Sequence, residues 1–370
     1  MPEIVLKNIA KRFGKFVAVE NLNLTIESNS FITLLGPSGC GKTTTLRMIA
    51  GLETPTEGSI TIDGKTVFDA DQGINLPPNK RDVGFLFQNY ALWPHMTVYQ
   101  NIAFGLENLK WDKKRIQDRV DEMLKLLKIE QFVKRYPAEL SGGQQQRVAI
   151  ARTLAPSPQV LFMDEPLSNL DAKLRGEMRT ELKRLHSDTN STFVYVTHDQ
   201  LEAMTLSTRV CLMETGVLQQ YAPPLEIYNK PANMFVASFV GNPTMNFIPA
   251  QVDGVSGNTV ILTTLGRKAV FTAETPVQAV GKEAVIGVRP EFLPIRENGA
   301  LKAAIYSTLP SGMETTVKAA CGDTMLTSVV FGSVDYRVDT EVHMDVVGDS
   351  IVLFDKENGK NAGVGKLEFA

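Results

Sequence analysis

The sequence has little cysteine, no long apolar run and no strong excess of charge of one sign. Its three cysteines are scattered along 370 residues without the spacing of metal ligands, so no disulfide framework is implied and a reducing cytoplasm fits. No run of about 18 apolar residues occurs, so we expect no segment that crosses a bilayer by itself. Residues 1–8 lack the basic and apolar regions of a signal peptide. A function at a membrane would therefore require partner subunits that span the bilayer.

The charge and apolar content narrow the class of protein further. A net charge of −3 argues against broad nucleic-acid binding, although it leaves room for local basic patches. The apolar fraction of 43% is that of an ordinary soluble globular chain. A length of 370 residues suggests two domains, or three.

A phosphate-binding pattern, G-x-x-x-x-G-K-[ST], occupies residues 36–43. A strand-like run precedes it and a helix-like segment follows it, which is the context that this motif requires. Glycines allow the backbone to turn tightly, and N–H groups at a helix N-terminus attract phosphate. We expect Lys42 to reach the β and γ phosphates and Thr43 to bind Mg²⁺. A plain glycine-rich turn is the alternative. The predicted loop residues are Gly36, Pro37, Ser38, Gly39, Cys40, Gly41, Lys42, Thr43 and Thr44.

Other short apolar runs also end in polar residues. These runs alternate with helical patterns, which indicates a parallel sheet covered on both faces. Ligands bind at the carboxyl ends of such strands, so the polar residues should meet at one edge. We expect Asp164 to hold Mg²⁺, Glu165 to polarise the attacking water, and His198 to contact the γ-phosphate. Gln88 is a candidate both to accept a hydrogen bond from this water and to contact the metal ion. Solvent-facing carboxylates, a structural histidine and a capping amide are the alternatives.

A second anion-binding signal lies in residues 140–147. Ser141 is a good helix cap, and Gly142 and Gly143 leave backbone N–H groups accessible at a helix N-terminus. The chain thus offers two phosphate sites but one phosphate loop with a lysine. Two chains that each complete the other's site would resolve this.

The remaining segments have simpler patterns. Residues 4–26 read as short strands with a turn at Phe13-Gly14-Lys15, and residues 97–136 read as helical with Thr97 as a cap. After about residue 235, short β-rich runs separated by turn residues predict a small barrel. The clearest runs are 285–288, 303–306, 314–317 and 351–354.

Several motifs follow one another in the order found in ATP-binding cassette (ABC) ATPases, which the chain resembles over residues 1–235. They are the phosphate loop, Gln88, Leu140-Ser141-Gly142-Gly143-Gln144, Met163-Asp164-Glu165-Pro166, Ser168-Asn169-Leu170-Asp171 and Val196-Thr197-His198. The resemblance implies an ATP- and Mg²⁺-dependent head-to-tail homodimer. Each ATP would lie between the phosphate loop of one chain and the Ser141–Gln144 segment of the other. It also places Asp171 at the dimer seam and Phe13 against adenine, where the family more often has Tyr.

Further motifs are similar to the carbohydrate-importer subfamily, which contains the maltose and multiple-sugar importer ATPases. They are residues 86–98, 170–175 and 197–200, and, with less specificity, 241–247 and 287–291. The implied fold is an α/β P-loop NTPase domain with a mostly parallel central sheet over residues 1–235, followed by an all-β OB-like (TOBE-type) regulatory barrel over 236–370. A helical subdomain over about 89–158 would dock on membrane subunits through 89–135.

The resemblance implies that the chain hydrolyses ATP to drive carbohydrate import. Two transmembrane permease subunits would be its partners at the cytoplasmic face of the membrane, where it would be peripheral, and a solute-binding protein would act indirectly. Import of glycerol phosphate, polyamine or ferric iron is one alternative. A soluble cassette ATPase acting on nucleic acid or ribosomes is another, but the chain has a single phosphate loop and no basic excess. The sequence leaves open which sugar is carried, how many importers are served, and whether the barrel binds a regulator.

Overall fold

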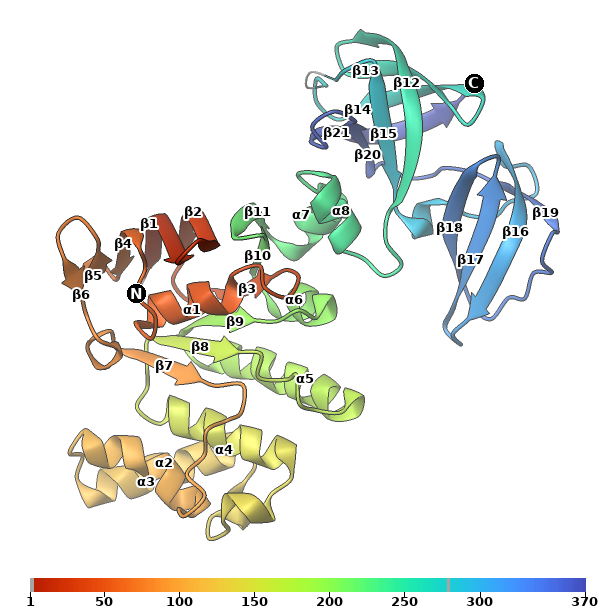
Figure 1. Ribbon diagram of the computed structural model, residues 1–370. Coiled ribbons are helices and arrows are strands. Elements are labelled where there is room, and N and C mark those ends of the chain that lie inside the picture. The colour runs from red at the N-terminus through yellow and green to blue at the C-terminus, as the bar shows by residue number, and fades with distance from the viewer. Residues whose placement is uncertain (1–2, 278–279) are drawn as a thin grey trace. The chain divides into compact units, whose positions relative to one another are not determined.

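Two compact units make up the computed structural model, which describes residues 3–277 and 280–370 (Figure 1). The first unit is Met1–Pro224 and the second is Leu225–Ala370. The boundary proposed from the sequence, after residue 235, lies inside the second unit, beyond α7 (Pro224–Asn229). Among the described residues, no helix is both long and apolar enough to cross a bilayer.

A six-stranded sheet forms the centre of the first unit, and all its neighbouring strands are parallel except the edge pair β10 and β11. This confirms the predicted, mostly parallel sheet. The strands β3, β8 and β9 are buried at every position, as expected of strands covered on both faces. In spatial order the sheet is β11 (Val217–Ala222), β10 (Arg209–Glu214), β3 (Phe31–Leu35), β9 (Thr192–Val196), β8 (Val160–Asp164) and β7 (Val83–Leu86).

Different elements pack against the two faces of this sheet. Side chains alternate across a strand, so Phe31 packs into one apolar cluster and Ile32 into another. The Phe31 cluster contains residues of α2 (Val98–Asn108), α3 (Lys113–Leu126), α4 (Gly142–Leu154) and α5 (Ala172–Asp188). The Ile32 cluster contains residues of α1 (Lys42–Ala50) and of a second sheet. Helix α6 (Gln200–Leu206) follows β9.

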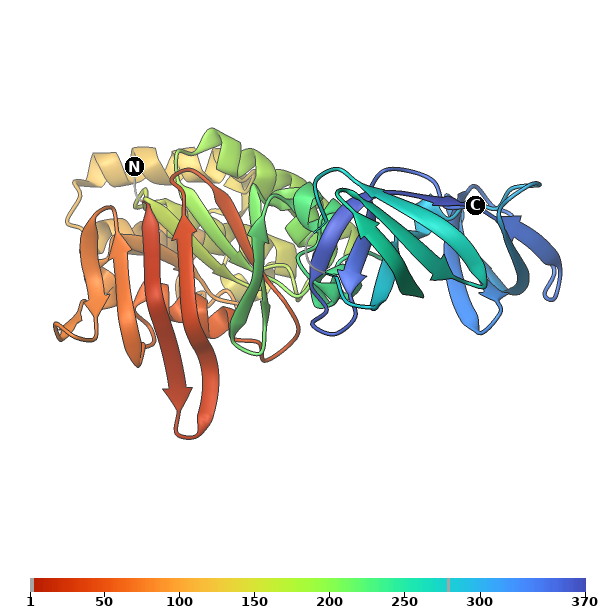
Figure 2. The ribbon, with the colours of Figure 1, turned by 90° about the horizontal axis from the view of Figure 1, so that it is seen from above.

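That second sheet is antiparallel and separate from the parallel one. The sequence predicts short strands over residues 4–26, but the structure has two long strands in this range. They pair from Ile4 with Ile26 to Phe13 with Phe16, so the turn lies where predicted (Figure 2). The polar/apolar alternation in β2 reflects one buried face. The strands are β1 (Ile4–Phe13), β2 (Phe16–Ile26), β4 (Glu57–Ile62), β5 (Lys65–Asp69) and β6 (Ile74–Asn75).

The predicted helical segment contains α2 (Val98–Asn108) and α3 (Lys113–Leu126), and α4 (Gly142–Leu154) follows. Thr97 caps α2, as predicted, in a reciprocal capping box with Gln100. Helix α3 buries an apolar stripe and exposes charged residues between its members. Single 3₁₀ turns lie at Pro78–Lys80, Glu130–Phe132 and Pro137–Glu139.

The second unit has a closed six-stranded barrel and a separate four-stranded sheet. The barrel was predicted, but the runs 303–306 and 314–317 belong to the other sheet, because the strands that contain them, β16 and β17, pair with each other and with β19 and β18. Barrel and sheet share one apolar cluster. The barrel strands are β12 (Asn246–Ser256), β13 (Thr259–Thr264), β14 (Arg267–Ala273), β15 (Glu283–Val288), β20 (Ile351–Asp355) and β21 (Asn361–Phe369). The sheet strands are β16 (Leu301–Pro310), β17 (Glu314–Cys321), β18 (Thr324–Phe331) and β19 (Glu341–Met344).

A fully buried arginine explains the 287–291 motif structurally. Arg289 stands before the 3₁₀ turn Pro290–Phe292 and donates to the carbonyl of Tyr228 through Nη2 (2.8 Å). It also donates to the last carbonyls around α8 (Met234–Phe239), at Ala237 and Val240. The guanidinium thus fastens α7 and α8 to the barrel of their own unit.

Candidate nucleotide site

The phosphate loop connects β3 to α1 and needs glycine at specific positions. Gly36, Gly39 and Gly41 have φ values of 151°, 81° and 97°, which residues with a Cβ rarely adopt. A Cβ on Gly36 would overlap the backbone carbonyl of Met213, and one on Gly41 would overlap that of Ala18. The loop is therefore packed closely between β10 and β2, with its N–H groups at the N-terminus of α1.

Lys42 lies inside this loop. Its side chain is almost completely buried, and Nζ donates to the carbonyls of Gly36 (2.8 Å) and Pro37 (2.9 Å). The ammonium charge and the helix N-terminus both favour an anion at this point. The thiol of Cys40 faces the same interior, where burial raises its pKa.

Thr43 and Asp164 provide adjacent oxygen atoms at the edge of the sheet. Thr43 Oγ1 donates to Asp164 Oδ1 at 2.9 Å, and Asp164 is buried at the end of β8. The other carboxylate oxygen accepts from Arg47 Nη2 at 3.3 Å. A hydroxyl beside a carboxylate is the hard oxygen set that Mg²⁺ prefers, so these residues fit that ion.

Glu165 and His198 lie at the ends of neighbouring strands. Glu165 Oε2 is 3.3 Å from His198 Nδ1, and the Glu165 N–H donates to the carbonyl of Val196 at 3.1 Å. Glu165 has a φ of 45°, an uncommon backbone conformation for a residue with a side chain, and such positions concentrate at functional sites. The His198 side chain is 58% exposed, so the pair faces the solvent at the sheet edge.

Gln88 follows β7 and contacts the segment that comes shortly after Glu165 in the sequence. Its Nε2 donates to Ser168 Oγ at 3.4 Å, and its carbonyl accepts from Asn169 Nδ2 at 3.2 Å. Ser168 Oγ in turn donates to the carbonyl of Glu165 at 2.8 Å. Gln88 is thus connected to the carboxylate residue through the 168–169 segment. The structure brings together the strand-end residues that the sequence predicts at one edge.

The Ser141–Gln144 segment forms the cap of α4. Ser141 Oγ accepts from the Gln144 N–H and Gln144 Oε1 accepts from the Ser141 N–H, a reciprocal capping box. Gly143 faces α5, where a Cβ would come within 2.5 Å of Leu174 Cδ2. No hydrogen bond or ion pair recorded for the described residues joins this segment to the phosphate loop of the same chain.

Two further predicted residues stand apart from the edge cluster. Asp171 is exposed and caps α5, accepting from the N–H groups of Lys173 (3.1 Å) and Leu174 (3.0 Å). Phe13 is half-exposed at the end of β1, with Lys11 Nζ 4.6 Å from its ring centroid. Its contact with adenine stays a prediction.

Sequence reasoning missed a buried network behind His198. Glu202 Oε2 accepts from Tyr195 Oη (2.9 Å) and from Thr197 Oγ1 (2.6 Å). Burial raises the pKa of Glu202. The signal that could have found it is a glutamate four residues after His198 on a short helix, which is too common a pattern to single out. Arg47 was missed as well, because its role comes from a contact with Asp164 on another element.

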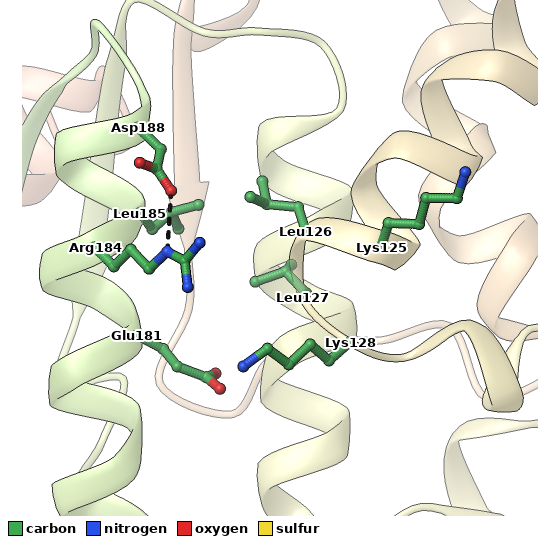
Figure 3. A pocket seen from close by; sticks show the side chains of 8 residues that line it. All are labelled: Lys125, Leu126, Leu127, Lys128, Glu181, Arg184, Leu185 and Asp188. Atoms are coloured by element: carbon green, nitrogen blue, oxygen red, sulfur yellow. Dashed lines mark ion pairs between the residues drawn. The ribbon is translucent and has the colours of Figure 1, made fainter.

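A pocket between α3 and α5 contains none of these residues (Figure 3). Leucines and charged side chains from the ends of the two helices line it, and Arg184 pairs with Asp188 at 3.5 Å. The catalytic candidates lie instead at the carboxyl ends of β8 and β9.

Comparison with known proteins shows what the chain resembles. Residues 19–168 match the family profile described as ABC transporter, and residues 241–293 match the MalK OB fold domain. The chain is 46% identical to the trehalose/maltose import ATP-binding protein MalK of Thermococcus litoralis, with 97% of this chain and 99% of the relative aligned. It is 47% identical to the spermidine/putrescine import ATP-binding protein PotA of Roseobacter denitrificans, over 80% of this chain and 79% of the relative.

Solved structures resemble the first part of the chain. One is a dimeric ATP-binding cassette in a post-hydrolysis state bound to ADP and Pi, with 34% identity and a TM-score of 0.52. The match covers 60% of this chain and 98% of that cassette. Another is a Clostridium perfringens subunit of the ABC transporter complex cbiONQ, with 29% identity, a TM-score of 0.56, and coverage of 60% and 89%.

Proposed function

This chain belongs to the family of ABC transporter ATP-binding proteins, and we propose that it is the ATPase subunit of a carbohydrate importer. The observation that carries the proposal is a 46% identity to a trehalose/maltose import protein over 97% of the chain, together with the MalK-type OB fold match at 241–293. The similarity to a polyamine import protein covers less of the chain, and polyamine is therefore the second candidate cargo.

In the proposed reaction, the loop N–H groups and Lys42 hold the phosphates of ATP. Thr43 and Asp164 would hold Mg²⁺, which when bound neutralises phosphate charge. Glu165 accepts a proton from the water that attacks the γ-phosphorus, while the bond from that phosphorus to the β-bridging oxygen breaks. His198, 3.3 Å from Glu165, holds a γ-phosphate oxygen. Gln88, connected to the same segment, orients the water or the ion.

Two copies of the chain would complete each site. The Ser141–Gln144 segment presents a helix N-terminus, and within the described residues it makes no hydrogen bond with the phosphate loop of its own chain. The loop that it would face would therefore come from a second copy. A cassette of similar fold is described as dimeric with ADP and Pi. A closed dimer that contacts ATP from both sides binds it better than an open one, and this difference drives closure. Closure would move two permease subunits at the cytoplasmic face of the membrane.

The test of the cargo uses the full chain with its two membrane subunits and their solute-binding protein in vesicles. We expect the loaded binding protein to stimulate ATPase activity with maltose or trehalose and not with spermidine. Stimulation by spermidine alone would support the polyamine alternative and contradict the carbohydrate proposal. Failure to co-purify with membrane subunits, combined with stimulation by RNA, would contradict the transport role itself.

A further inference from the structure

Arg175 connects two segments of the candidate site. It lies in the first turn of α5, and Nη2 donates to the carbonyl of Leu170 at 3.1 Å. Nη1 contacts Asp199 Oδ2 at 3.5 Å. The Nε atom is buried and has no hydrogen-bond partner within the described part of the chain. One buried donor of the guanidinium is therefore unsatisfied. The position of the side chain depends on the two Nη contacts.

Both contacts are next to proposed catalytic or interface residues. Leu170 precedes Asp171, and Asp199 follows His198. Asp199 uses its other oxygen to cap α6, accepting from the N–H groups of Leu201 (2.8 Å) and Glu202 (3.2 Å). One carboxylate thus fixes the start of α6 and at the same time accepts from α5.

Thr197, which precedes His198, also holds the backbone of this turn in place. The Asp199 N–H donates to Thr197 Oγ1 at 3.0 Å, and this hydroxyl donates to the buried Glu202 at 2.6 Å. The His198 imidazole itself is exposed, and in the described part of the chain its one side-chain partner is Glu165. Its direction is therefore set by the turn that carries it, because its own contacts with the protein are few.

We propose that Arg175 is a positioning residue, which holds the turn carrying His198 against the segment ending at Asp171 and thereby keeps His198 beside Glu165. This inference rests on the proposed ATPase function. The planar guanidinium suits the task, because a fork of fixed geometry can contact a carboxylate and a carbonyl together. A single ammonium on a flexible stem would not fix both at once. Loss of the link should displace the imidazole while leaving the phosphate loop unchanged.

The experiment compares purified full-length variants by steady-state ATPase activity, ATP binding and melting temperature. For Arg175→Met we expect kcat to fall by about 10- to 100-fold, the scale for a displaced catalytic group. ATP affinity should stay within about twofold, because Lys42 and its loop are untouched. Arg175→Lys should recover part of the loss. Arg179→Met, one turn further along α5 and in no ion pair among residues 3–277 and 280–370, should match the parent.

Asp199→Asn is the decisive second variant, since asparagine also caps helices well and so preserves the start of α6. It should lower kcat as Arg175→Met does, and the double variant should be no worse than either single one. Additive losses would overturn the proposal, as would an unchanged kcat in Asp199→Asn. Parallel losses of ATP affinity and melting temperature would show a merely structural role. These outcomes differ from failure of the proposed function, in which Glu165→Gln would retain the parent rate.

Discussion

Thr43 and Asp164 are joined by a hydrogen bond of 2.9 Å although 121 positions separate them in the sequence. The helix that starts after the phosphate loop and the end of β8 therefore meet at a hydroxyl and a carboxylate. Arg47 binds the other carboxylate oxygen from the same helix. The carboxylate of Asp164 is thus oriented through both of its oxygens.

Removing the charge of Asp164 should weaken magnesium binding more than it changes the fold. Asp164→Asn keeps the shape and the acceptor for Thr43 but loses the negative charge that favours a divalent cation. We expect a fall in ATPase activity of about 100-fold or more at millimolar Mg²⁺, partly restored by raising Mg²⁺ in a titration. Asp82→Asn makes the same chemical change at an exposed position and is the control. Unchanged Mg²⁺ dependence in Asp164→Asn would contradict the assignment.

Glu165 is the proposed proton acceptor, and its replacement separates binding from turnover. Glu165→Gln has nearly the same shape and can keep a hydrogen bond toward His198, which lies 3.3 Å away. It cannot accept the proton of water, so hydrolysis should be abolished while ATP still binds and the closed dimer accumulates. Gel filtration with ATP and a phosphate-release assay would measure the two effects. Glu177→Gln on the exposed face of α5 is the control, and hydrolysis at the parent rate in Glu165→Gln would show that the base lies elsewhere.

The edge cluster was predictable because each member follows an apolar run of its own. Parallel strands align their carboxyl ends, so Asp164 and His198 had to be near each other once the sheet was parallel. The partners of the strands in residues 4–26 were not predictable in this way. Polar/apolar alternation identifies a strand with one buried face but does not say which sheet it joins.

The same limit explains the error in the second unit. The runs 303–306 and 314–317 have the composition of barrel strands but belong to β16 and β17, which pair with each other in a separate sheet. Strands β16 and β17 form a local hairpin, whereas β15 pairs with the distant β20 to close the barrel, and composition does not show which strand β15 joins. Glu202 escaped notice for a related reason, and Arg175 was noted only as the last residue of the 170–175 motif. The contacts of both residues are with other elements or are buried, which a sequence pattern does not show.

Gly143 and Gly142 provide a matched pair for the packing of α4 on α5. A Cβ on Gly143 would lie 2.5 Å from Leu174 Cδ2, whereas one on Gly142 would lie 3.8 Å from Leu170 Cδ2, an ordinary contact. Gly143→Ala should therefore destabilise the first unit by about 1–3 kcal/mol through overpacking. Gly142→Ala should be neutral or slightly stabilising, because alanine favours helix. Melting curves without nucleotide measure this, and equal effects of the two substitutions would contradict the packing argument.

His186 should make stability depend on pH below neutrality. Its ring packs against Phe31 and Phe193, with centroids 5.4 and 5.0 Å away, and burial lowers its pKa below the usual 6.5. As the pH falls below about 6.5, His186 binds a proton in the unfolded chain but not yet in the folded chain. The free energy of unfolding therefore decreases. The difference in melting temperature between pH 7.5 and pH 5.5 should shrink in His186→Phe, which keeps an aromatic ring but cannot titrate. His95→Phe, at an exposed position, should keep the parent's difference. An unchanged difference in His186→Phe would mean that other groups cause the pH dependence.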